Sequence, residues 1–120
     1  MSNSVNAVSI HPYFKIHPGQ LDAVKAALPG FIQKTSTEPG NLYYGFSLNG
    51  DELFCREAYT DAAGLLTHIE NIGPELAHLL SLTDVIRVEV HGPAAELEKL
   101  RGPLAGLKPV WFEWYGGVSR

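Results

Sequence analysis

The apolar and polar residues of this chain change their spacing several times, and each change predicts an element of secondary structure. Some stretches alternate between apolar and polar side chains, the period of two that β-strands show; these are residues 5–16, 42–48, 53–59 and 85–90. Others repeat apolar side chains every three or four positions, as one face of a helix does; these are residues 20–35, 62–73, 74–82 and 94–101. An aromatic stretch, 109–117, predicts a last strand.

The stretch 53–73 carries the clearest of these changes and organises the rest of the prediction. Its first seven residues place one set of side chains on a single strand face: Leu53, Cys55, Glu57 and Tyr59. Thr60 and Asp61 then offer oxygens that cap a helix start. The helix that follows places a second set on one side: Leu65, Ile69, Ile72 and Leu76. Since His68 lies about two turns into this helix, we expect Glu57 and His68 to face one space.

Turn residues and prolines predict further details. Asn49-Gly50 between two alternating stretches predicts a β-hairpin, and Gly73-Pro74 predicts that two helices meet there. Pro12 predicts a bulge or an unpaired position unless its strand is at an edge, and Pro29 predicts a kink. The first helix is expected to bury Leu21, Val24, Leu28, Phe31 and Ile32. The strand 85–90 is expected to set Ile86, Val88 and Val90 against Val85, Arg87, Glu89 and His91.

The order of these elements predicts an α+β protein with a ferredoxin-like βαββαβ sandwich and an antiparallel sheet. With 120 residues, the chain fits a single domain, 1–120, with a core at 5–91 and an added C-terminal helix and aromatic strand at 92–120. Four aromatic side chains of that strand form a large apolar surface: Trp111, Phe112, Trp114 and Tyr115. We therefore expect a homodimer in which a partner subunit covers them.

Composition excludes several classes of partner. The formal charge of −4, from 9 Lys and Arg against 13 Asp and Glu, argues against nucleic acid. No apolar run approaches the ~20 residues that cross a bilayer, and the N-terminus lacks the features of a signal peptide. One cysteine, Cys55, forms no internal disulfide and suits a cytoplasmic location. The five histidines form no close ligand pair, so no metal site is expected.

Several of these segments together resemble the antibiotic biosynthesis monooxygenase family. They are the His17-Pro18-Gly19 end of the first strand, the Glu38-Pro39-Gly40-Asn41 turn, and the stretch 57–63 followed by Leu65 and His68. The resemblance implies a dimeric α/β barrel with a pocket between sheet and helices. It also implies oxygenation of phenols, quinols or polyketide aromatics without metal or flavin. This chain departs from the family in lacking the second histidine that many members carry after the position of His68.

A haem-degrading branch of the same family is a minor alternative. It implies Asn6 as the strand asparagine and His68 or His78 as the helical histidine, but the helical tryptophan is missing because Trp111 and Trp114 both lie in the tail.

His68 is the leading catalytic candidate, as the base that deprotonates a substrate hydroxyl. Its alternative role is a packed histidine with one hydrogen bond. Glu57 is either a second acid–base group with a raised pKa or a structural partner of an arginine such as Arg87. Three aromatic side chains are candidates for substrate binding: Tyr44, Tyr59 and Trp114.

The function predicted first is a cofactor-independent monooxygenase acting on a small aromatic or quinol-type compound in an apolar pocket. Such a reaction needs a dry pocket and one base, because the deprotonated substrate itself supplies the electrons. The alternative is a non-catalytic dimer, of small-molecule-binding or stress-response type, in which His68 only orients a hydrophobic ligand. One scaffold hosts several activities, so the sequence leaves both open.

Overall fold

The computed structural model describes residues 6–119, so residue 5, the predicted start of the first strand, lies outside it. The strands are β1 (Val8–Ile16), β2 (Asn41–Asn49), β3 (Glu52–Tyr59), β4 (Thr83–Gly92) and β5 (Val110–Glu113). The helices are α1 (Leu21–Thr35), α2 (Ala62–Asn71), α3 (Gly73–Leu80) and α4 (Ala94–Arg101), followed by a short 3₁₀ helix η1 (Ala105–Leu107). The predicted order of elements is confirmed.

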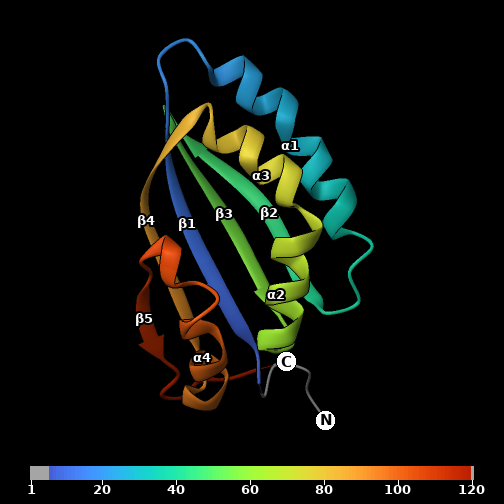
Figure 1. The fold of residues 1–120 in the computed structure, drawn as a ribbon, viewed down its shortest axis with the longest axis vertical. Coiled ribbons are helices and arrows are strands. Elements are labelled where there is room, and N and C mark those ends of the chain that lie inside the picture. The colour runs from blue at the N-terminus through green and yellow to red at the C-terminus, as the bar shows by residue number, and fades with distance from the viewer. Residues whose placement is uncertain (1–5, 120) are drawn as a thin grey trace.

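One sheet joins all five strands in the order β2-β3-β1-β4-β5 (Figure 1). The first four strands pair antiparallel, as in a ferredoxin-like fold, which confirms the predicted fold class. The added C-terminal strand β5 runs parallel to β4. The reason is the connection, because α4 and η1 form a helical crossover that returns the chain in the direction of β4.

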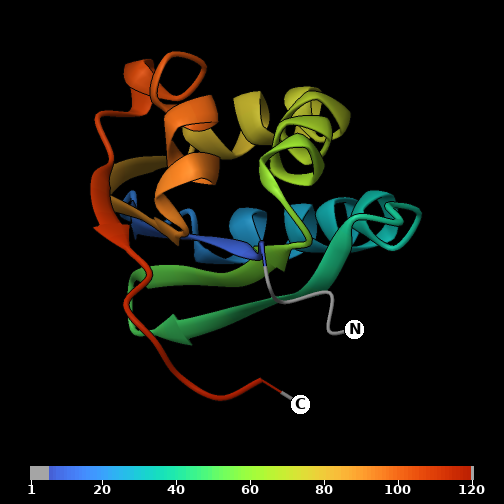
Figure 2. The ribbon, with the colours of Figure 1, turned by 90° about the horizontal axis from the view of Figure 1, so that it is seen from below.

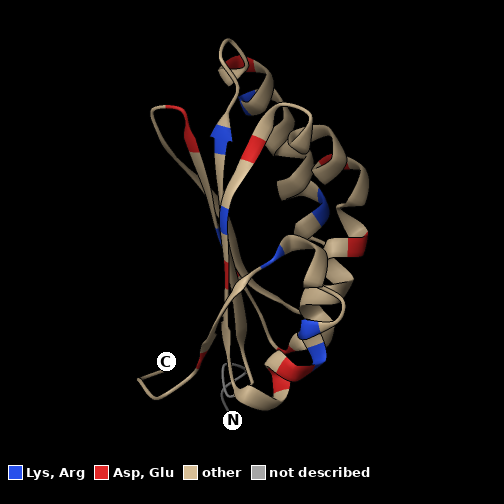
Figure 3. Ribbon diagram, turned by 60° about the vertical axis from the view of Figure 1, so that its left-hand side comes forward, with Lys and Arg blue, Asp and Glu red and all other residues tan. Residues whose placement is uncertain are grey.

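The four helices all cover one face of the sheet, and no helix within residues 6–119 lies on the other face (Figure 3). Two groups of buried side chains fill the space between the layers. One includes Tyr59, Leu65 and Leu97 under α2 and α4, and the other includes Phe14, Phe31 and Leu79 under α1 and α3. The face that the helices cover is called the inner face below, and the opposite one the outer face.

The hairpin and the helix starts follow from the sequence as predicted. Asn49 pairs with Glu52, so Gly50 and Asp51 form a two-residue loop, and the positive φ of Gly50 (59°) is one that glycine adopts without strain. The Asp61 side chain accepts a hydrogen bond from the Gly64 N–H at 2.8 Å, which caps α2. A separate α3 begins at Gly73, as the Gly-Pro pair predicts.

A bulge in β4 changes which residues face inward. Tyr13 pairs with Arg87 and Phe14 pairs with Val85, so Ile86 is the extra residue of the bulge. Ile86 is therefore exposed and Val85 turns inward, which reverses the predicted faces of these two residues. Pro12 lies opposite Val88 in the central strand β1, and the irregularity falls one residue after it.

One prediction about α1, the extent of its buried stripe, is wrong. Leu21 and Ile32 are exposed, because α1 contacts mainly α3 and β2 and so covers only a narrow strip. The buried stripe is reduced to Val24 and Phe31, with Leu28 half-buried. The helix itself contains Pro29 and ends at Thr35, as predicted.

The C-terminal strand is shorter than predicted, since β5 ends at Glu113. Trp111 packs against the buried cluster that includes Leu97, and the guanidinium carbon of Arg101 lies 4.9 Å from its ring centre. Trp114 and Tyr115 follow in an irregular, exposed segment that passes to the outer face (Figure 2). No helix among the described residues is long and apolar enough to cross a membrane.

Candidate active site

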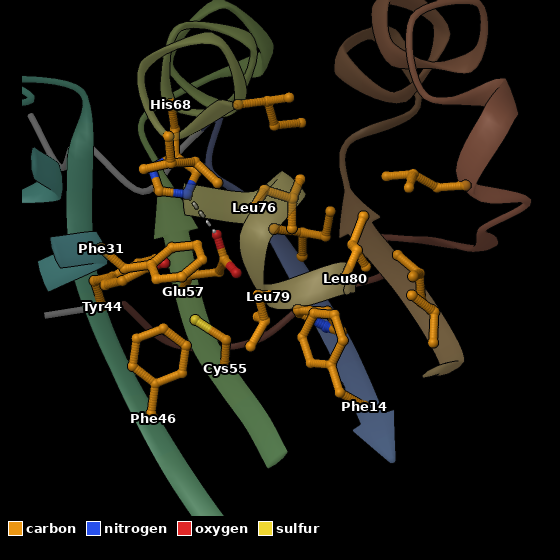
Figure 4. Close-up of a pocket in the computed structure, with 17 residues that line it drawn as sticks. Phe14, Phe31, Tyr44, Phe46, Cys55, Glu57, His68, Leu76, Leu79 and Leu80 are labelled. Atoms are coloured by element: carbon orange, nitrogen blue, oxygen red, sulfur yellow. Dashed lines mark ion pairs between the residues drawn. The ribbon is translucent and has the colours of Figure 1, made fainter. Parts of the chain in front are cut away.

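A pocket lies between the inner face of the sheet and helices α1, α2 and α3 (Figure 4). Its volume is about 80 Å³. Most of the side chains around it are aliphatic or phenyl groups, such as Phe14, Leu76 and Val88. The lining residues with polar side-chain atoms are Tyr44, Cys55, Glu57 and His68, and the close-up shows them near one another. The pocket is thus an apolar space with a small polar cluster.

The local structure explains how these side chains meet. Alternation along β3 turns Cys55 and Glu57 to the inner face, and β2 presents Tyr44 directly opposite Glu57. Helical spacing along α2 turns His68 to the same side as Leu65 and Ile72, and all three are buried. The two periodicities therefore bring a carboxyl group and an imidazole together across the interior.

His68 is held from behind by a third group, Glu38. The Nδ1 atom of His68 lies 3.0 Å from each carboxylate oxygen of Glu38, and both side chains are almost fully buried. The Asn71 Nδ2 group donates hydrogen bonds to Glu38 Oε2 at 2.9 Å and to the Lys34 carbonyl at 3.1 Å. Glu38 thus bridges the turn after α1 to the last turn of α2.

Glu57 lies on the other side of the imidazole. Its Oε1 atom is 3.5 Å from His68 Nε2 and accepts a hydrogen bond from the Tyr59 hydroxyl at 2.6 Å. Tyr59 is fully buried, and its ring centre lies 5.0 Å from that of His68. Glu38, His68 and Glu57 therefore form a buried row, with the imidazole in the middle.

Burial moves the proton affinities of this row in opposite directions. Burial raises the pKa of Glu57 to about 7, partly offset by the Tyr59 hydrogen bond. The pKa of His68 is lowered from its ordinary value because burial outweighs the nearby Glu38 carboxylate. Burial also raises the pKa of Cys55 and of Tyr44, so both stay protonated at neutral pH. The row therefore combines a neutral imidazole with a carboxyl group that titrates near neutrality.

This arrangement suits proton transfer to and from a bound molecule. A neutral imidazole accepts a proton, and a carboxyl group with a pKa of about 7 gives one up or takes one back at neutral pH. Among residues 6–119, no three His, Cys, Asp or Glu side chains are grouped so that they would hold a metal ion.

The structure brings together three of the five predicted site residues in the pocket lining: His68, Glu57 and Tyr44. Tyr59 touches the same cluster but is fully buried behind it, so it serves Glu57 rather than a bound ring. Trp114 lies apart from the pocket, in the exposed segment near the outer face. The pairing of Glu57 with Arg87 is wrong, because Arg87 is on the outer face and bonds Glu89 at 2.6 Å.

Sequence reasoning missed Glu38 and Asn71. In the sequence Glu38 is recognisable only as part of a turn, and it lies thirty positions before His68, so no local pattern connects the two. Asn71 lies one helical turn after His68, so its position on the same side of α2 is visible in the sequence, but its acceptor is not. Only the packing of the turn against α2 joins these residues.

The remaining histidines lie outside the pocket lining. His17 contacts Asp84, His11 lies against His91 on the outer face, and His78 is exposed on α3. Asn6, which the haem-degrading alternative requires, is exposed in a turn before β1 and does not line the pocket. The structure therefore does not bring Asn6 together with His68 or His78 in the pocket, as the haem-degrading alternative requires.

Comparison with solved structures places this geometry in a family. MupZ from Pseudomonas fluorescens is 50% identical to the chain, with a TM-score of 0.91, and the match covers 96% of this chain and 95% of MupZ. SnoaB, a cofactor-independent oxygenase from Streptomyces nogalater, is 12% identical, with a TM-score of 0.62 over 71% of this chain and 90% of SnoaB.

A further protein, from Chloroflexus aurantiacus and described as of antibiotic biosynthesis monooxygenase type, is 18% identical. Its TM-score is 0.61 over 73% of this chain and 93% of its own. No family model and no curated protein sequence matches the chain. The fold of these structures confirms the predicted resemblance at the level of fold, and the chain belongs to the family of MupZ.

Proposed function

We propose that the pocket is the active site of an enzyme that works by acid–base catalysis on an uncharged, largely apolar substrate. The observation that carries this proposal is the buried row of Glu38, His68 and Glu57 beside an otherwise apolar space. Groups with shifted pKa values in a concave apolar site are typical of catalysis. A histidine that only packs needs one hydrogen bond, and His68 has carboxyl groups on both sides.

Oxygenation without a cofactor is the first candidate reaction. His68 Nε2 would take the proton of a phenol or quinol hydroxyl, and the resulting anion would give electrons to molecular oxygen. One oxygen atom would enter the product as a carbonyl oxygen and the other would leave as water, with all electrons supplied by the substrate. The fold shared with SnoaB, a cofactor-independent oxygenase, supports this candidate, as does the apolar lining of the pocket.

A redox-neutral reaction is the second candidate, and Glu57 specifically favours it. Oxygenation requires only a base, whereas this site also contains a carboxyl group whose pKa is raised to about 7. In such a reaction His68 would take a proton from an attacking hydroxyl group or water while Glu57 gives one to an oxygen leaving carbon. The distance of 3.5 Å between His68 Nε2 and Glu57 Oε1 supports this candidate, because a proton acceptor and a proton donor would then act on neighbouring atoms of a substrate.

The lining also indicates the kind of substrate. None of the residues that line the pocket is lysine or arginine, whereas Glu57 is one of them and Glu38 lies directly behind His68. Burying a carboxylate or phosphate there would leave its charge unpaired beside other acidic groups. The volume of about 80 Å³ is also below the ~150 Å³ of a cavity that binds benzene, so the walls must move apart for a larger substrate.

The test is oxygen consumption by the purified protein on a panel of quinols and polycyclic phenols. We expect His68→Asn to lower turnover by ~10²-fold or more while the protein stays folded. Asparagine is preferable to alanine because His68 is buried, so alanine would leave a cavity. His78→Asn is the matched control, since His78 is an exposed histidine on the neighbouring helix, and it should keep full activity.

The outcomes separate the candidates. Oxygen uptake that disappears in His68→Asn supports oxygenation. Conversion of a hydroxylated substrate under nitrogen, also lost in His68→Asn, supports the redox-neutral reaction. Binding of substrate with no conversion in air or under nitrogen supports the non-catalytic alternative and contradicts an enzyme.

A further inference from the structure

We infer that Glu38 is a positioning residue that, held by Asn71, fixes His68 in the tautomer with its proton on Nδ1 and its lone pair on Nε2. The tautomer follows from hydrogen-bond geometry alone, and its catalytic meaning rests on the proposed role of His68 as the base. An imidazole has two neutral tautomers, and only the one with a bare Nε2 accepts a proton on the side of Glu57.

The orientation of the Asn71 amide is the first step. Its two neighbours in hydrogen-bond range are the Lys34 carbonyl, at 3.1 Å, and Glu38 Oε2, at 2.9 Å. A carbonyl oxygen is only an acceptor and so is a carboxylate oxygen, so both hydrogens of the amide nitrogen are engaged. Turning the amide over would set its oxygen against two acceptors, so Asn71 must donate to Glu38.

The proton on Nδ1 is the second step. The carboxylate of Glu38 offers only acceptors, and both of its oxygens lie 3.0 Å from His68 Nδ1. Thr35 Oγ1 is 3.5 Å from the same nitrogen, but the hydroxyl hydrogen is used at 2.7 Å by the Phe31 carbonyl. Every neighbour of Nδ1 therefore accepts, and Nδ1 must carry the hydrogen.

The third step concerns the other ring nitrogen of His68, Nε2. With the proton on Nδ1, the lone pair of a neutral imidazole is on Nε2, 3.5 Å from Glu57 Oε1. The Tyr59 hydroxyl donates to that same oxygen of Glu57 at 2.6 Å. Glu38 thus faces away from the substrate space and determines which face of the imidazole is basic.

The main chain holds Glu38 in place. Two residues after Glu38, the Gly40 carbonyl accepts a hydrogen bond from the Thr60 N–H at 2.8 Å, just before α2 begins. A Cβ atom on Gly40 would lie 3.1 Å from the Gly64 Cα, so the turn and the first turn of α2 are in close backbone contact. This contact ties the Glu38 turn to the helix that carries His68.

The test is the tautomer of His68, observed by two-bond ¹H–¹⁵N correlation NMR of the full chain labelled with ¹⁵N-histidine. The His68 signals are assigned as those missing from His68→Asn. We expect the wild type, above the pKa of His68, to show a protonated Nδ1 and a bare Nε2. The Nε2–H tautomer in the wild type would overturn the inference without any further variant.

Glu38→Gln makes the test sharper. Asn71 still requires an oxygen from residue 38, so the new amide nitrogen should face His68 and donate to Nδ1. The tautomer should then reverse to Nε2–H, and the pKa of His68 should fall further because the carboxylate charge is lost. Glu70→Gln removes an exposed carboxylate from the same helix and should change neither property. A Glu38→Gln protein that keeps the proton on Nδ1 would contradict the inference.

Activity gives an independent result once a substrate is known. Glu38→Gln should lower kcat by ~10²-fold or more with little change in KM, as expected when the base holds the wrong tautomer. If the tautomer reverses while kcat is unchanged, Glu38 positions His68 as inferred but His68 is not the base. The failure of the proposed function is then distinct from the failure of this inference.

Discussion

At the scale of single residues, Glu57 is a buried ionisable side chain whose environment affects stability. Its carboxyl group is buried and accepts a hydrogen bond from the Tyr59 hydroxyl at 2.6 Å. Burial raises the pKa of Glu57 from an ordinary value of 4.5 to about 7, so the folded protein holds this proton more tightly than the unfolded chain.

Stability should therefore depend on pH through Glu57. Below about pH 4.5 both states are protonated, and between that pH and about 7 only the unfolded state has lost the proton. Rising pH over this range lowers the free energy of unfolding, by a total of ~3 kcal/mol. Glu57→Gln is neutral at every pH, so it should gain this amount relative to the wild type at pH 8 and none at pH 4.

Urea unfolding of both proteins at pH 4, 6 and 8 measures this difference. Comparison with Glu57→Gln isolates the effect of Glu57 from that of His68, whose lowered pKa acts on stability in the opposite direction. Glu70→Gln, which removes an exposed carboxylate, should follow the wild type at each pH. A constant difference between wild type and Glu57→Gln would contradict a buried carboxyl with a raised pKa.

At the scale of elements, the turn between α1 and β2 positions the site as much as any helix does. It carries Glu38 to His68, and it meets α2 at Gly40 and Gly64, where no side chain separates the two backbones. A residue with a Cβ at position 40 must push the turn away from α2, because the atom that it meets belongs to the backbone.

Gly40→Ala should thus destabilise the protein by ~1–3 kcal/mol, as overpacking of a close contact does. It should also weaken the contact of Glu38 with His68 and lower the pKa of His68, measured by NMR titration. Gly45→Ala is the matched control in β2, because a Cβ there meets nothing within 4 Å. Equal stability of the two variants would show that the contact of the turn with α2 is unimportant.

At the scale of the whole molecule, the outer face of the sheet carries a continuous row of rings without a covering helix. Ring centres lie 4.8 Å apart for Tyr13 and Phe54, and 4.5 Å apart both for His11 and His91 and for His91 and Phe112. The tail adds Trp114 and Tyr115, which are exposed. Apolar surface of this extent on a small protein is typical of an interface, so the homodimer remains our prediction.

We expect the wild type to sediment as a dimer at micromolar concentration and Phe54→Glu to sediment as a monomer, because a buried unpaired carboxylate opposes association. Ile32→Glu is the control, since Ile32 is also exposed but lies on α1, away from the outer face. Removal of residues 114–120 tests the tail and keeps Trp111, which packs against the core. A monomeric wild type would contradict the prediction.

The sequence predicted the elements of the fold because local chemistry specifies them. The alternation of side chains along 53–59 predicted which residues of β3 face inward, and Asp61 predicted where α2 starts. The bulge at Ile86 was missed because spacing alone does not show where one strand gains a residue against its neighbour.

The site was predicted in part, for a related reason. Glu57 and His68 lie eleven positions apart on a strand and the helix that follows it, so their periodicities determine that they share one space. Glu38 reaches His68 only because the turn between α1 and β2 packs against α2. Trp114 lies outside the predicted pocket because β5 ends at Glu113 and the chain then continues in an irregular segment. Contacts between distant segments depend on three-dimensional packing, which no local pattern contains, so the tertiary structure alone decided which group holds the imidazole.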